Sequence, residues 1–163
     1  MACNINYDEI SSITIDCEAA VGGIKTLAIA NWAAIRPADS AFKEINFNNQ
    51  DKTTNYTEAL ENGDDGSTVV TQTLTVFFSG FNADTRTTLN ELCNPNIKAI
   101  IKVTLANDTV VYMGERFGAV LTKVESSSGS ATRDTQGYTA TWTAEEATHG
   151  TVVAGDTGTP LSL

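Results

Sequence analysis

TQTLTVFFSGFNADTRTTLNELCNPNIKAIIKVTL, residues 71–105, decides the fold class of this chain, because it contains a strand pattern, a helix pattern and a second strand pattern. Over residues 68–79, one face of the predicted strand is apolar apart from a single glutamine: Val70, Gln72, Leu74, Val76 and Phe78. The other face carries threonines at positions 71, 73 and 75. This period of two residues predicts a long strand with one buried face and one polar face.

One short helix is predicted between the two strands. Asn82 or Asp84 can cap its N-terminus, because a short polar side chain accepts a hydrogen bond from the first free N–H groups. Pro95 limits its C-terminal end, since the residue before a proline avoids the helical conformation. Between these limits a narrow apolar stripe at helical spacing consists of Leu89, Leu92 and Cys93.

Strand patterns dominate the rest of the chain, which contains 24 threonines. They cover residues 12–17, 24–32, 42–48, 97–105, 110–114, 118–126 and 138–144. Turn signals separate them at roughly the 8–12-residue spacing that is typical of sandwiches and barrels. We therefore predict one mainly β domain over residues 1–163, a two-sheet β-sandwich or barrel with one flanking α-helix.

Three segments of this domain are predicted to lie outside the regular strands. Residues 49–67 are strongly polar and are predicted to form a long loop, although strand-like arms are possible; loops of this length are usually functional or disordered. Residues 1–20 are predicted to form an N-terminal arm or strand. Residues 147–163 are rich in glycine and threonine and are predicted to form a flexible C-terminal arm.

The charge and the cysteines restrict the possible partners and the compartment. A formal net charge of −10 repels nucleic acid, although it would suit a surface past which DNA must slide without sticking. The cysteines are Cys3, Cys17 and Cys93; we expect free thiols, with a Cys3–Cys17 disulfide as the alternative for an extracellular protein. The N-terminus lacks the features of a signal peptide and no apolar run is long enough to span a bilayer, so we expect synthesis in the cytoplasm.

Few residues are suited to catalysis, and we expect neither an enzyme nor a cofactor. His149 is the only histidine, so any triad or imidazole-based metal site would depend on it. Trp32 and Trp142 lie in strand patterns, where a core or interface position is more common than a sugar-binding platform. The best metal candidate is an acidic group whose spacing differs from that of an EF-hand, so a solvated acidic loop is the alternative to a calcium site. This group consists of Glu58, Glu61, Asp64 and Asp65.

Three stretches of the chain resemble the tail tube proteins of tailed bacteriophages. They are residues 3–32, with a C-x13-C spacing followed by VGGIKTLAIANW, then residues 71–105, and then residues 111–146. Within the last stretch the resemblance rests on an ordered set of positions: Gly114, Gly118, Gly129, Asp134, Gly137, Tyr138 and Glu145.

The resemblance implies a structural protein of the virion tail, assembled in the host cytoplasm, with a β-barrel fold and one flanking helix. Six copies would form a ring, and rings would stack into a hollow tube through which DNA passes without specific binding. The partners would be further copies of this chain and other tail proteins, such as the tape measure, the terminator and the baseplate or hub, with no membrane. The resemblance does not distinguish contractile from non-contractile tails.

The segment 49–67 is the candidate for contacts between subunits or rings. We predict that Tyr56 and Leu60 act as apolar anchors there, and that Asp64 and Asp65 lie in the same contact. Two other functions stay open. One is a tail ring protein that does not polymerise, such as a terminator or hub. The other is a β-sandwich module that binds carbohydrate or acts as an adhesin.

Overall fold

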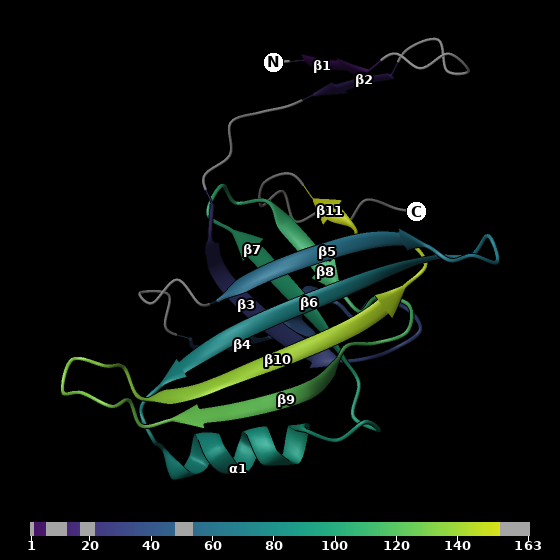
Figure 1. The fold of residues 1–163 in the computed structure, drawn as a ribbon. Coiled ribbons are helices and arrows are strands. Elements are labelled where there is room, and N and C mark those ends of the chain that lie inside the picture. Colours follow the sequence, from purple (N-terminus) through teal and green to yellow (C-terminus); the bar gives the residue numbers. More distant parts are fainter. Residues whose placement is uncertain (1, 6–12, 17–21, 48–53, 154–163) are drawn as a thin grey trace.

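The computed structural model describes residues 2–5, 13–16, 22–47 and 54–153. Over these residues the chain forms two antiparallel sheets that face each other, a separate two-stranded hairpin and one α-helix (Figure 1). The prediction of a mainly β sandwich with one flanking helix is confirmed. The barrel alternative is wrong, because the two sheets are not joined edge to edge into a closed wall. No helix of the described part is long and apolar enough to cross a membrane.

The elements follow one another along the chain with short connections. Their bounds are β1 (Ala2–Ile5), β2 (Ile13–Asp16), β3 (Ile24–Asn31), a 3₁₀ turn η1 (Asp39–Ala41), β4 (Lys43–Ile45), β5 (Asn55–Asn62), β6 (Thr68–Ser79), α1 (Ala83–Leu92), β7 (Ala99–Leu105), β8 (Val110–Met113), β9 (Val120–Ser127), β10 (Gly137–Glu146) and β11 (Val152–Val153).

The first sheet has the strand order β5-β6-β10-β9, and each neighbouring pair is antiparallel. Its central strands β6 and β10 show the alternation that the sequence predicts. Gln72 and Leu74 on β6, and Trp142 on β10, point inward and are almost fully buried. Threonines alternate with them on the outer face, as the two-residue period of a strand requires.

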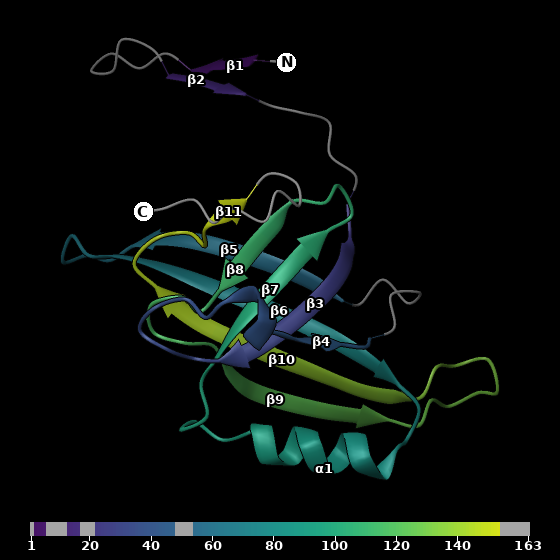
Figure 2. The same ribbon diagram turned by 180° about the vertical axis from the view of Figure 1, so that it is seen from behind.

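The second sheet has the order β11-β8-β7-β3-β4 and crosses the first; it lies behind the first sheet in Figure 1 and in front of it in Figure 2. β-Branched and other aliphatic side chains from β3, β7 and β8 fill the space between the sheets, including Leu27, Ile101, Val103 and Met113, all fully buried. The two inner faces therefore share one hydrophobic core, as is usual for a sandwich.

A smaller apolar cluster covers part of the outer face of the second sheet. There Trp32 and Phe42 pack on Ile100 and Tyr112. The segment between them crosses this face, and the Arg36 guanidinium lies 4.4 Å from the centroid of the Tyr112 ring. This second layer explains why Ile100 and Tyr112, on the outer face of β7 and β8, are buried.

Helix α1 packs beside β9 (Figure 1). The Asn82 side chain accepts a hydrogen bond from the backbone N–H of Asp84 at 2.8 Å, which confirms Asn82 as the N-cap. Leu89 is buried against the core, and the Arg86 Nε donates a hydrogen bond of 2.9 Å to the Tyr138 hydroxyl at the start of β10. The helix thus adds both apolar and polar contacts to the first sheet.

A long loop is not formed over the described residues 54–67, whereas the alternative for this segment, a strand-like arm, is confirmed. Asn55–Asn62 forms edge strand β5, paired along its whole length with β6, and only residues 63–67 form the turn between them. The backbone N–H of Gly63 donates to the Ser67 carbonyl at 2.7 Å, which closes this turn. The polar composition that suggested a loop belongs to an edge strand whose outer side faces solvent. Residues 49–53 lie outside the described part.

The two ends of the chain also contain strands. The predicted strand over residues 12–17 is confirmed as β2, and it pairs with β1, which the sequence did not reveal beyond a general N-terminal arm. Residues 147–153, predicted to be a flexible arm, instead cross to the second sheet and pair there as β11. Cys17 and residues 154–163 lie outside the described part, so the Cys3–Cys17 alternative stays a prediction; Cys93 is an exposed free thiol.

Candidate functional site

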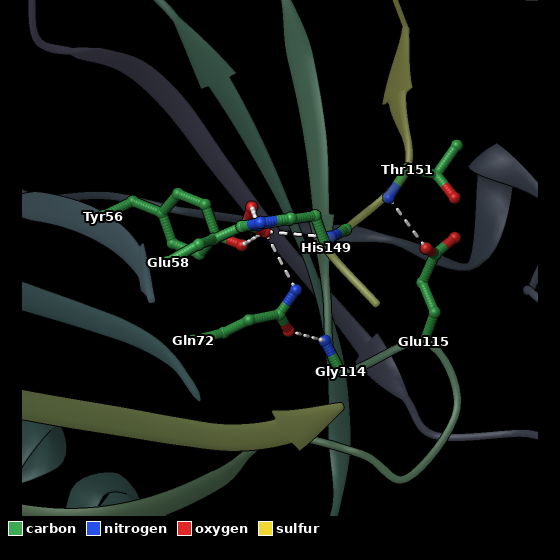
Figure 3. A network of polar contacts seen from close by, with 8 residues as sticks. Tyr56, Glu58, Gln72, Gly114, Glu115, His149 and Thr151 are labelled. Carbon is green, nitrogen blue, oxygen red and sulfur yellow. Dashed lines mark hydrogen bonds and ion pairs between the residues drawn. The ribbon is translucent and has the colours of Figure 1, made fainter. Parts of the chain in front are cut away.

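A network of polar side chains lies where β5, β6 and the C-terminal segment approach one another (Figure 3). At its centre, the Glu58 carboxylate accepts four hydrogen bonds. Its Oε1 accepts from the Tyr56 hydroxyl, from Gln72 Nε2 at 3.0 Å and from the backbone N–H of Gly150 at 2.9 Å. Its Oε2 lies 2.7 Å from His149 Nδ1. One carboxylate therefore joins two neighbouring strands of the first sheet to a segment from the far end of the chain.

Gln72 extends the network into the core and connects the two sheets. Its side chain is 1% exposed, and its Oε1 accepts a hydrogen bond of 2.9 Å from the backbone N–H of Gly114 at the end of β8. The amide of Gln72 thus uses its donor side on Glu58 and its acceptor side on the opposite sheet. Both ends of this buried polar group are satisfied, as burial requires.

Two further glutamates accept backbone N–H groups from nearby connections. Glu115 Oε2 accepts from the N–H of Thr151 at 3.0 Å, and its Oε1 forms an ion pair with Arg36 at 3.4 Å. The buried Glu146 Oε1 accepts from the N–H groups of residues 116–117 at 3.1 Å each. These two carboxylates thereby accept hydrogen bonds from backbone N–H groups that are not paired with a neighbouring strand.

The network changes the acid–base properties of its members. Burial works to raise the pKa of the Glu58 carboxyl, but the hydrogen bonds from Tyr56, Gly150, His149 and Gln72 outweigh it and hold that pKa below its ordinary value. Burial, together with the hydrogen bond to Glu58, raises the pKa of the Tyr56 hydroxyl far above its ordinary value. Glu58 is therefore ionised at neutral pH while Tyr56 stays protonated as its donor.

This geometry favours a structural role for the network. The space beside Gln72, His149 and Gly150 amounts to about 10 Å³, roughly one water molecule. Glu58 already uses both oxygens on protein donors. In the described part of the chain, no group of three or more histidine, cysteine, aspartate or glutamate side chains is placed to hold a metal ion.

The predicted calcium candidate is not brought together. Glu58 points inward on β5, whereas Glu61 is three positions further along the strand and points to the opposite face. Asp64 and Asp65 lie in the exposed turn beyond the strand, where Asp65 Oδ1 accepts hydrogen bonds from the backbone and the hydroxyl of Ser67. The calcium hypothesis is wrong because a strand, unlike a loop, separates neighbouring carboxylates onto two faces.

The predicted contact residues occupy different environments on the same hairpin. Tyr56 is half-buried against the core, and its hydroxyl is engaged by Glu58. Leu60 is 55% exposed at the open edge of the first sheet. Asp64 and Asp65 are exposed in the turn. Leu60 is thus the residue of this set that offers apolar surface to a partner, and the contact itself stays a prediction.

A second feature of possible functional use is the uncovered outer face of the first sheet. It presents short polar side chains in cross-strand rows, because Thr57, Thr73 and Thr143 occupy paired positions on three neighbouring strands. The residues of this face, called the threonine face below, are Asn55, Thr57, Ala59, Glu61, Val69, Thr71, Thr73, Thr75, Phe77, Val120, Thr122, Lys123, Glu125, Thr139, Thr141, Thr143 and Glu145.

The threonine face carries few charges, and these are unbalanced. Lys123 forms an ion pair with Glu125 at 2.8 Å, while Glu61 and Glu145 are not balanced by a further lysine or arginine on this face. Three glutamates and one lysine leave a net charge of −2. A groove of about 560 Å³ lies at one end of the face and is lined in part by the exposed side chains of Val69 and Phe117.

Sequence reasoning identified β6 and its buried glutamine but missed the network around it. Gln72 was visible as the one polar residue on an apolar strand face, which is a usable signal for a buried polar contact. Glu58 was considered only as a metal ligand. Nothing local in the sequence marks Glu115 or Glu146, whose partners are 36 and about 30 positions away along the chain.

Comparison of this chain with protein-family models, with curated proteins and with solved structures finds no match.

Proposed function

We propose that this protein is a structural subunit that assembles with further copies of itself into rings, and that the rings stack into the hollow tail tube of a bacteriophage. The proposal combines the resemblance of three sequence stretches with the geometry of the first sheet. In this role the protein has no catalytic site. Its surfaces, rather than a pocket, carry the function.

The observation that carries the proposal is the pair of open edges on the first sheet. No strand of the described part pairs with the outer edge of β5 or of β9, and each of these strands is eight residues long. Four consecutive antiparallel strands run alternately up and down, so β5 and β9 point in opposite directions. If β9 of one copy lay beside β5 of the next, the sheet would continue in antiparallel pairing.

Such pairing repeated around a closed ring would remove every open edge of the first sheet. Unprotected edges otherwise template aggregation, so closure has a physical benefit. Ring closure would also cover Leu60. This side chain is on the inner face of β5, but it is 55% exposed because β5 is an edge strand.

The threonine face suits the wall of a channel for DNA. Its hydroxyl groups are polar and short, so they keep the wall hydrated, and its one lysine, Lys123, is held in an ion pair with Glu125. Its net negative charge repels the DNA backbone, in line with the formal charge of −10 of the whole chain. In the proposed ring this face points to the bore and the second sheet lies outside it.

The test is assembly of the purified protein followed by light scattering and negative-stain electron microscopy across a concentration series. The wild type is expected to form rings or hollow tubes at high concentration. Leu60→Ser is expected to raise the concentration needed by at least about tenfold, because it removes apolar surface from the proposed contact. Val152→Ser is the matched control, since Val152 is similarly exposed, at 48%, but lies on edge strand β11 of the other sheet.

The outcomes separate the functions considered. Rings that never stack would favour a terminator or hub protein over the tube. A monomer at all concentrations, with equal behaviour of both variants, would contradict assembly through the first sheet. Binding of that monomer to a glycan array would then favour the carbohydrate-binding module.

A further inference from the structure

Residues 147–153, called the C-terminal strap below, connect the two sheets. The strap leaves the end of β10 in the first sheet and reaches the outer edge of β8 in the second (Figure 1). There Val152 and Val153 pair with β8, and the Tyr112 N–H donates to the Thr151 carbonyl at 3.1 Å. A two-residue strand at a sheet edge provides little stability by itself, so other contacts must hold the strap.

One of these contacts is apolar, since Val153 is buried in a cluster with Ile100, Val110 and Tyr112, and the polar ones come from carboxylates. The N–H of Gly150 donates to Glu58, and the N–H of the next residue, Thr151, donates to Glu115. The His149 ring contacts the second oxygen of Glu58 at 2.7 Å. Figure 3 shows these bonds arriving from both sides of the strap. Glu58 therefore forms two of the three polar side-chain contacts that the structure describes for residues 149–151 of the strap.

The strap also fits closely against its seat. A Cβ atom on Gly150 would lie 2.3 Å from the Tyr112 carbonyl oxygen, 2.9 Å from Glu58 Oε1 and 3.0 Å from Gln72 Nε2. Only a residue without a side chain allows the backbone to approach the Glu58 carboxylate this closely. The contact between the strap and Glu58 is thus specific to this segment of the chain.

We propose that Glu58 is an acid-sensitive latch: when its carboxylate is protonated, the C-terminal strap detaches and the outer edge of β8 becomes free. A protonated carboxyl group carries no charge and has a hydrogen on one oxygen, so it can no longer accept the full set of four bonds. The side chain is only 16% exposed, so water replaces the lost bonds poorly while the strap stays in place.

The direction of the pH dependence follows from the surroundings of Glu58. Two titratable groups contact Glu58 directly: Tyr56 on its own strand and His149 on the strap. The other charged groups around this site are Glu115 and Arg116 after β8, Glu146 at the end of β10, and Arg36, which forms an ion pair with Glu115. Because the hydrogen bonds hold the pKa of Glu58 below its ordinary value of 4.5, Glu58 is ionised at neutral pH and its stabilisation of the strap is complete there. It is lost as the pH falls through that lowered pKa.

The experiment measures amide hydrogen exchange by NMR on the unassembled protein between pH 7 and pH 3. The protection of the Gly150 and Thr151 amides is compared with that of Trp142, an amide of the central strand β10. We expect the protection of the strap amides to fall by at least about tenfold relative to Trp142 on acidification, the factor expected for loss of one hydrogen bond to a charged acceptor.

Three variants complete the test. Glu58→Gln keeps the shape of the side chain but cannot titrate, so strap protection should be low at pH 7 and should change at least about threefold less with pH than in the wild type. Gly150→Ala should leave the strap open at every pH. Glu125→Gln is the matched control, because it removes an exposed carboxylate of the first sheet that forms an ion pair with Lys123, on the opposite face from Glu58; it should behave like the wild type.

The proposal is overturned if the strap amides and Trp142 lose protection together at every pH, or if the wild-type pH response persists unchanged in Glu58→Gln. Should that variant fail to fold, the wild-type titration and the Glu125→Gln control still decide between a local and a global response. The result does not depend on tube formation, since it concerns the second sheet of a single chain and not the open edges of β5 and β9.

Discussion

Replacing Gln72 by leucine tests whether the buried polar network stabilises the sandwich. Leucine has a similar volume, so the change leaves little cavity. It removes the donor to Glu58 and leaves the N–H of Gly114 without its acceptor in a buried position. The first loss is about 1.5–3 kcal/mol and the second about 1–3 kcal/mol. Burial of the more apolar leucine side chain offsets about 1.5–3 kcal/mol of this.

The expected net effect is a decrease of about 2 kcal/mol in the free energy of unfolding at pH 7. It can be measured by urea denaturation followed by tryptophan fluorescence, because Trp142 is buried in the same sheet. Thr73→Val is the control, since Thr73 is the next residue on β6 and points to the threonine face; its effect should stay within about 0.5 kcal/mol. The reasoning is refuted if Gln72→Leu is as stable as the wild type or more stable.

Three further predictions concern other parts of the fold. Asn82→Ala should lower the free energy of unfolding by about 1 kcal/mol in urea denaturation, because it removes the cap on the Asp84 N–H, while Asn82→Ser should retain most of it. Gly137→Ala should destabilise the protein by about 1–3 kcal/mol in thermal melts, because the alanine Cβ would lie 2.1 Å from the Phe78 carbonyl oxygen. An unchanged melting temperature would show that β10 and β6 can move apart at this position without loss of stability. The free energy of unfolding should fall as the pH drops below 4.5, the ordinary pKa of a glutamate carboxyl, because the lowered pKa of Glu58 makes its protonation unfavourable to the folded state. This acid loss should be smaller in Glu58→Gln, and equal losses would exclude Glu58 as a contributor.

The fold class could be predicted from the sequence because its signals are local. The alternation over Thr68–Ser79 predicts a strand with the bounds that the structure has for β6, and the buried face is the predicted one. Asn82 at the start and Pro95 beyond the end of α1 bracket a helix that the structure places between residues 83 and 92. Caps, breakers and side-chain periods act within a few residues, so they are visible without a tertiary structure.

Strand β5 could not be predicted in the same way. Its sequence, NYTEALEN, contains two glutamates and two asparagines, which are uncommon in strands and typical of polar loops. It becomes a strand because β6 offers a long partner whose backbone groups need hydrogen bonds, and because one side of an edge strand remains in solvent. Tertiary pairing here overrides local preference.

The apolar side chains, their alternation and the turn signals can all be seen in the sequence, and they are sufficient to predict a two-sheet sandwich with one helix. The contacts of Glu58 with His149 and Gly150, 91 and 92 positions further along the chain, can be seen only in the folded protein. The neighbouring sequence of a glutamate is the same whether its carboxylate is solvated or accepts a hydrogen bond from a backbone N–H far along the chain. Its role depends on which segments the packed core brings beside it, and that information is absent from any short stretch of sequence.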